Sequence, residues 1–150
     1  MPISINYVVP TILAIMKLAL VAFVLLLSVA EAAWPAQQAM LARVTVYWRA
    51  QGQRKARWNN TPLRNGHCAV DPHKIPYGSK VVVDRETLTA VDTGPAVISR
   101  KAARSEGHTA EERRAVVIDR YFESEKQALA WARSHPKFIV VRVLPPSPPK

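Results

Sequence analysis

Short apolar segments separated by polar turns make up most of the chain after residue 40. The clearest is Leu41–Trp48, where β-branched and aromatic residues partly alternate with other types and predict a strand. Further strands are predicted over His67–Val70, Ser79–Val83, Thr87–Val91, Ala96–Ile98, Ala115–Ile118 and Phe138–Leu144. Many short strands with one late helix predict a mainly β fold, in the form of a small barrel.

Helical patterns are confined to the second half. Ser124 can cap a helix over Ser124–Ser134, whose apolar face comes from Ala128, Leu129 and Trp131 and which Pro136 follows. The charged segment Ser99–Arg114 contains one glycine and no proline, so it predicts a partly helical surface insertion. Pro145–Lys150 is a Pro-rich tail that we expect not to pack.

The N-terminal segment has the three parts of a secretory signal. Lys17 precedes a short apolar run, and Ala30-Glu31-Ala32 forms a small-residue cleavage site. Residues 1–33 are therefore predicted to be a signal peptide, and residues 34–144 an exported domain in the periplasm, outside the cell or in the cell wall. The apolar stretch before Met16 lengthens the segment, so an uncleaved N-terminal anchor is the alternative.

The chain carries a formal net charge of +10. Removing the signal leaves this charge unchanged, because the segment holds one lysine and one glutamate. A basic exported domain is attracted to anionic polymers such as cell wall, a lipid surface or nucleic acid. The single cysteine, Cys68, excludes an intrachain disulfide and is predicted to be a small buried residue.

Three aspartates follow apolar runs, at Asp71, Asp92 and Asp119. Each stands where a strand can leave the core, so the three carboxylates could converge on one cleft. Asp92-Thr93-Gly94 by itself is also typical of retroviral-type aspartic proteases, in which two subunits pair their aspartates. That class is disfavoured, because Val116–Ile118 runs into Asp119 instead of the glycine such subunits need and because the chain is strongly basic.

Read together, the aspartate segments resemble a known family. The ordered set is Gly66–Ser79 with Asp71, then Ala90–Gly94 with Asp92, then Ile118–Tyr121 with Asp119. It resembles the 3D domain, named for three aspartates, of MltA-type lytic transglycosylases and small secreted relatives that cut peptidoglycan. The resemblance covers roughly residues 44–132 and implies a double-psi β-barrel with one helix in its C-terminal half.

The chain departs from that family in two places. Pro95 stands where the family usually has a second glycine, and the charged insertion over residues 99–114 delays the third aspartate. Both changes fall between Asp92 and Asp119, so they alter the rim of the expected cleft.

The resemblance also implies a reaction, which is cleavage of the bond between N-acetylmuramic acid and N-acetylglucosamine with a 1,6-anhydro product. One carboxylic acid protonates the leaving oxygen and then, as carboxylate, takes the proton of the sugar's own 6-hydroxyl. Its pKa must be raised by burial or by a nearby like charge. By family position Asp119 is the acid/base, Asp92 tunes it and Asp71 supports the turn and the cleft. The expected substrate-binding residues are Tyr47, Thr93, Gly94 and Tyr121.

The expected partner is therefore the glycan strand of peptidoglycan, bound by a monomer. No cofactor is expected, and the four histidines show no metal-ligand spacing. Membrane contact is expected only through an uncleaved signal. The rival hypothesis is a non-catalytic barrel that binds cell wall or glycan. A basic secreted nucleic-acid binder is supported by charge alone, so nucleic acid is not a predicted partner.

Overall fold

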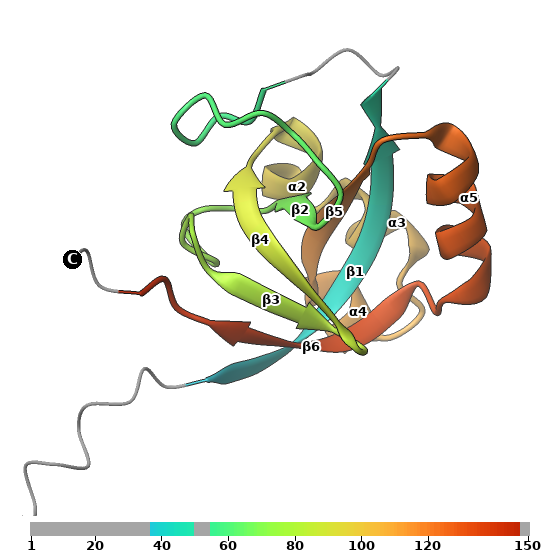
Figure 1. Ribbon diagram of the computed structural model, residues 1–150. Helices are drawn as coiled ribbons and strands as arrows, with labels where there is room; N and C mark the ends of the chain where they lie inside the picture. The colour runs from blue at the N-terminus through green and yellow to red at the C-terminus, as the bar shows by residue number, and fades with distance from the viewer. Residues whose placement is uncertain (1–36, 50–54, 148–150) are drawn as a thin grey trace, which may run out of the picture. The chain divides into compact units, whose positions relative to one another are not determined.

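The computed structural model describes residues 37–49 and 55–147. The predicted signal or anchor lies outside these residues, and Ala36–Lys150 forms one unit. Six strands close into a barrel in the order β1-β5-β2-β4-β3-β6 (Figure 1). They are β1 (Gln38–Trp48), β2 (His67–Ala69), β3 (Lys80–Val83), β4 (Glu86–Asp92), β5 (Val116–Phe122) and β6 (Phe138–Leu144). The predicted mainly β barrel is confirmed.

The strand pairing has an internal symmetry. β1 pairs with β5 and β2 with β4 in parallel, whereas all other neighbours in the barrel are antiparallel. The pattern is unchanged when β1, β2 and β3 are exchanged for β4, β5 and β6. The two halves of the chain are therefore interlocked, because each half contributes one strand to each of the two parallel pairs.

One predicted strand is wrong. Residues 96–98 belong to α2 (Pro95–Ser99), which has Pro95 at its start and Gly94 as its N-cap. Proline fixes φ at a helical value and lacks the N–H that a first helical residue leaves unused, so it starts a helix well. The Ile98 N–H then donates to the Gly94 carbonyl at 3.1 Å, which closes the first turn.

The insertion is helical, as predicted, but it is not merely a surface feature. It forms α3 (Lys101–Glu106) and α4 (Ala110–Arg114), and α4 begins with a capping box between Thr109 and Glu112. Ala103 is fully buried and packs with Val117 of β5. Figure 1 shows α2, α3 and α4 grouped along one side of the barrel. The insertion therefore builds a second apolar layer outside the strands.

The predicted late helix is α5 (Glu125–Ser134), and the Ser124 side chain caps it by accepting from the Gln127 N–H. Ala128 and Trp131 join the apolar cluster that fills the barrel. Arg120 lies over the rings of Phe122 and Trp131, at 4.5 and 4.8 Å from their centres, and pairs with Glu86. Among the described residues, no helix has the length and apolarity to cross a membrane.

The first residue of the predicted Pro-rich tail lies partly buried against the barrel, whereas Pro146 and Ser147 are exposed and residues 148–150 lie outside the described residues. Pro145 is half-buried. A Cβ added at Gly78 would lie 3.2 Å from the Cβ of Pro146 and 3.3 Å from the Trp58 ring. Gly78 also has a φ of +81°, which favours glycine. The start of the tail is thus held beside the turn that precedes β3.

Candidate active site

The candidate site is built on one face of β1. Side chains alternate along a strand, so Arg43, Thr45 and Tyr47 share a face while Ala42 and Val44 point into the barrel core. Each of the three contacts one carboxylate. Arg43 pairs with Glu106 at 3.0 Å, the Thr45 hydroxyl donates to Asp119 Oδ1 at 2.9 Å, and the Tyr47 hydroxyl donates to Asp92 Oδ2 at 3.2 Å. Three carboxylates therefore follow one another along β1.

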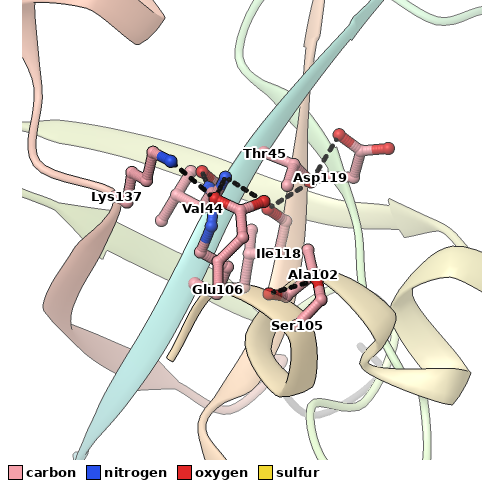
Figure 2. A network of polar contacts seen from close by, with 9 residues as sticks. Val44, Thr45, Ala102, Ser105, Glu106, Ile118, Asp119 and Lys137 are labelled. Carbon is pink, nitrogen blue, oxygen red and sulfur yellow. Dashed lines mark hydrogen bonds and ion pairs between the residues drawn. The ribbon is translucent and has the colours of Figure 1, made fainter. Parts of the chain in front are cut away.

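Figure 2 shows the middle and one end of this row. Thr45 and Asp119 point toward each other from neighbouring strands, and Glu106 reaches out from α3 toward Lys137. The Lys137 ammonium lies 2.8 Å from Glu106 Oε2. Glu106 is thus held by two cations, while Asp119 is held by a neutral hydroxyl.

Asp92 and Asp119 flank Ala69. The register opposes Ala69 to Asp119 on one side and to Asp92 on the other. The pairing of β2 with β4 slips by one residue between Cys68 and Ala69. Without this bulge, alternation would turn Asp92 into the barrel with Leu88 and Ala90. The bulge brings Asp92 onto the same outer face as Asp119, on the other side of Ala69.

Both aspartates line one pocket of about 130 Å³, which we call the aspartate pocket. Its floor is formed by strand residues and its wall by the start of α2. The lining residues are Tyr47, Ala69, Asp92, Thr93, Gly94, Ala96, Val97 and Asp119. Four of the predicted catalytic or substrate-binding residues besides Asp119 are thus gathered here: Tyr47, Asp92, Thr93 and Gly94.

Asp119 has the electrostatics of a proton donor. Burial raises its pKa to about 6, and the negative charge of Asp92 acts in the same direction. The hydrogen bond from Thr45 and the positive charge of Arg43 lower the pKa and only partly oppose the rise. A carboxyl group with a pKa near 6 is partly protonated close to neutral pH, which general acid catalysis requires.

Asp92 is fixed by hydrogen bonds. It is 2% exposed, and its Oδ1 accepts from the Arg57 N–H at 2.9 Å while Oδ2 accepts from Tyr47. Burial, then the charges of Asp92 and Asp119, raise the pKa of Tyr47 well above its usual value, so Tyr47 remains a donor. Asp92 is therefore a rigid negative charge beside Asp119.

Thr93 and Gly94 leave the wall of the pocket open to a ligand. The Thr93 hydroxyl is buried, and none of the described residues forms a hydrogen bond with it. A Cβ added at Gly94 would have no atom within 4 Å, and its φ of −173° is open to any residue. Gly94 thus leaves free space at the pocket rather than satisfying a backbone constraint.

Two predicted site residues lie elsewhere. Asp71 belongs to its turn, where its Oδ1 accepts from the His73 N–H at 3.0 Å and its carbonyl accepts from Ile75 at 2.9 Å. Tyr121 is 2% exposed and its ring meets Tyr47 edge to face at 5.2 Å between centres. Neither lines the aspartate pocket. The structure thus places Asp71 in a supporting turn, and Tyr121 behind the Tyr47 ring.

Sequence reasoning missed three residues of the carboxylate row. Arg43 and Thr45 could have been found, because they precede Tyr47 at the two-residue spacing of a strand face. Glu106 carries no such signal, since its place depends on how the insertion folds back on β1. The row can therefore be recognised only in part without the tertiary structure.

Two other chemistries find no support at this site. Burial, then the charge of Asp119, raise the pKa of Cys68 to about 12, so the thiol is not an activated nucleophile and is buried as predicted. Within residues 37–49 and 55–147, no group of three histidine, cysteine or acidic side chains could hold a metal ion.

A comparison with models of known protein families finds no match to this chain, and a comparison with curated protein sequences finds none either.

Proposed function

We infer that the protein is an exported lytic transglycosylase that cleaves the MurNAc–GlcNAc bond of peptidoglycan. The observation that carries this inference is the pairing, in one pocket, of a half-buried Asp119 whose pKa is raised to about 6 with a hydrogen-bonded Asp92. One group can hold a proton near neutral pH, and the other places negative charge beside it. This is the division of labour that the reaction needs.

In the proposed reaction, Asp119 donates its proton to the glycosidic oxygen as the bond to the muramic acid C1 breaks. The charge of Asp92 favours the positive charge that develops on the sugar ring. The Asp119 carboxylate then takes the proton of the C6 hydroxyl, whose oxygen bonds to C1 and closes the 1,6-anhydro ring. Thr45 holds the Asp119 carboxyl through both steps, and the Thr93 hydroxyl can hydrogen-bond the sugar.

The strand pairing supports the double-psi form of the barrel. Exchange of β1-β2-β3 with β4-β5-β6 leaves the pairing unchanged, and each half contributes to both parallel pairs. Two interlocked halves of this kind are what the double-psi architecture requires. This symmetry supports the double-psi form that the motif resemblance implies, and it rests on other residues than the motifs do.

A polymeric substrate fits the surroundings of the aspartate pocket. Ala96 lines both this pocket and a neighbouring space of about 300 Å³ that is also lined by Thr45, Lys101, Ser105 and Glu106. We call this second space the insertion pocket. A ligand longer than one sugar can therefore extend from Asp119 along α2 and α3, and the basic charge of the chain favours an anionic polymer.

A non-catalytic glycan-binding barrel is the second candidate. It is favoured by the small size of the aspartate pocket, about 130 Å³, which α2 with Pro95 at its start closes on one side. In that case the same pocket would hold a sugar without cleaving it. The two candidates share the partner and the surface, and they differ in the chemistry of Asp119.

Digestion of purified peptidoglycan separates the two candidates. The exported protein is expected to release muropeptides that end in 1,6-anhydro-muramic acid, identified by mass because they lack one water. Asp119→Asn should release none, whereas Asp71→Asn should release them as the unchanged protein does. A wild type that sediments with peptidoglycan but yields no anhydro product would establish the binding module instead.

A further inference from the structure

A third pocket lies beyond the carboxylate row, between β1 and the end of α5. It encloses about 300 Å³, and its lining residues with polar side-chain groups are Arg43, Thr45, Trp131, His135 and Lys137. We call it the α5 pocket. Its charged lining residues are Arg43 and Lys137, and no acidic residue lines it. The contrast with the aspartate pocket is complete, because there the two charged lining residues are both acidic.

Two residues that line the α5 pocket carry buried hydrogen-bond donors without partners among the described residues. Arg43 and Trp131 are each 9% exposed, and the Arg43 Nε–H and the Trp131 Nε1–H are buried without an acceptor among the described residues. Both groups can only donate. Buried donors are nearly always paired, so two unpaired ones at one pocket indicate a missing acceptor. A ligand that suits this pocket carries acceptor oxygens and negative charge.

Glu106 partly neutralises the pocket from outside. Its carboxylate is held by the Arg43 guanidinium at 3.0 Å and the Lys137 ammonium at 2.8 Å, so one negative charge faces two positive ones. Figure 2 shows the contact with Lys137. The Lys137 side chain is 68% exposed and can turn toward a ligand. Glu106 does not line the α5 pocket, and it competes with any carboxylate that binds there.

The α5 pocket and the insertion pocket adjoin at Thr45. Thr45, which holds Asp119, lines both the α5 pocket and the insertion pocket, and the insertion pocket shares Ala96 with the aspartate pocket. Residues two apart on a strand are about 6.7 Å apart, so Arg43 lies roughly 7 Å along β1 from Thr45. One substrate molecule can therefore reach both Asp119 and Arg43.

We propose that the α5 pocket binds a carboxylate of the peptide that muramic acid carries, with Arg43 and Lys137 as the anion-binding residues and Trp131 as a neutral donor. The proposal rests on the proposed function in taking the glycan as the scaffold that presents the peptide. It makes the protein selective for glycan strands that still carry their peptides.

The Trp131 indole gives a direct readout of binding. The chain has four tryptophans, so a ¹H–¹⁵N spectrum shows few indole signals, and loss of one signal in Trp131→Phe identifies Trp131. The ligands are a soluble GlcNAc–MurNAc-tripeptide, the same disaccharide without peptide, and sodium acetate. We expect the tripeptide ligand alone to shift the Trp131 signal. No shift with that ligand, or an equal shift with the peptide-free disaccharide or with acetate, would overturn the proposal.

Three charge variants sharpen the same titration. Lys137→Gln should weaken binding of the disaccharide-tripeptide about three- to tenfold, and Glu106→Gln should tighten it by about as much, because the competing carboxylate is gone. Lys126→Gln removes an exposed positive charge of α5 that does not line the pocket, so it should leave the affinity unchanged. Equal weakening by Lys126→Gln and Lys137→Gln would mean attraction by overall charge and would contradict a built site.

Failure of this proposal can be told apart from failure of the proposed function. The titration follows binding at Trp131 and does not need cleavage, whereas anhydro products report Asp119. Release of anhydro products together with a silent Trp131 signal would retain the enzyme and remove the α5 pocket as a peptide site. A Trp131 shift without anhydro products would retain the pocket in a binding protein.

Discussion

The turn around Asp71 and the pocket around Asp119 start from similar sequences. In each, an apolar run ends in an aspartate, and the same family pattern assigns both to one cleft. Asp71 accepts a hydrogen bond from the backbone N–H of His73 within its own turn, whereas Asp119 accepts one from the Thr45 side chain and shares its pocket with a second carboxylate. The comparison shows that burial and partners, not the preceding apolar run, decide which aspartate can carry a proton.

Replacing Asp119, the proposed proton carrier, should have the largest effect on cleavage. Asp119→Asn keeps the shape of the side chain but cannot give and take a proton. Loss of general acid–base catalysis lowers rates by about 10²–10⁴-fold, so anhydro-muropeptide release should fall at least that far. Near-normal release by this variant would assign the acid to another residue, with Asp92 the first candidate.

The same variant should be more stable than the wild type at neutral pH. Aspartate in an unfolded chain titrates near pH 4, whereas the pKa of Asp119 in the folded protein is about 6. Between these values the folded state binds the extra proton, so the free energy of unfolding falls as pH rises from about 4 to about 6 and stays lower above. An asparagine at this position cannot ionise, so the Asp119→Asn variant does not lose this part of its free energy of unfolding as the pH rises. Denaturant unfolding should show a gain of about 1–3 kcal/mol at pH 7.5 that closes below pH 4.

Tyr47→Phe tests how far the rigidity of Asp92 matters. The change removes the hydroxyl that donates to Asp92 Oδ2 and leaves the ring against Tyr121. A hydrogen bond to a charged group contributes about 1.5–3 kcal/mol, so we expect roughly a tenfold loss of cleavage rate with a modestly lower melting temperature. An unchanged rate would show that Asp92 keeps its place without the hydrogen bond from the Tyr47 hydroxyl.

Loss of the Asp71 side chain should lower the free energy of unfolding and leave the cleavage rate nearly unchanged. Asp71→Ala leaves the exposed His73 N–H to water, so the free energy of unfolding should drop by about 1 kcal/mol while the cleavage rate stays within about twofold. Asp71→Asn keeps an acceptor oxygen and serves as the matched control, with stability close to the wild type. A loss of cleavage in Asp71→Asn would place this carboxyl in the reaction and remove the contrast with Asp119.

The smallest expected effect is a shift of the pH–rate profile when Glu106 of the insertion is changed. Glu106 balances Arg43, and the positive charge of Arg43 lowers the pKa of Asp119. Glu106→Gln leaves that charge less opposed, so the upper limb of the pH–rate profile should move to lower pH by about 0.3 unit. The profile of kcat/KM against pH measures this. A shift to higher pH would contradict the sign of the coupling.

Much of the barrel could be predicted from the sequence, because its strands are β-branched runs between turn residues. Leu41–Trp48 and Phe138–Leu144 are strands as expected, and Ser124 caps α5. The predicted strand at residues 96–98 is wrong. The apolar residues there suggested a strand, but Pro95 favours the start of a helix and these residues are helical. The closing order of the strands depends on contacts distant in sequence and could not be derived from the apolar pattern.

The site was predictable only where it rests on strand ends. Asp92 and Asp119 were expected together, yet they share a face because a bulge between β2 and β4 turns Asp92 outward, and no residue in the sequence marks that slip. Glu106 was hidden for a similar reason, since a charged insertion gives no sign of which strand it covers. Long-range register, rather than residue type, sets both features.

The most direct test of the account is the titration of the Asp119 carboxyl group, followed by ¹³C NMR and assigned by its absence in Asp119→Asn. We predict a midpoint near pH 6, well above the value near 4 of an aspartate in water, because the group is buried beside Asp92. A midpoint at or below 4 would contradict the account, since Asp119 would then hold no proton to give at the pH at which the glycan is to be cleaved.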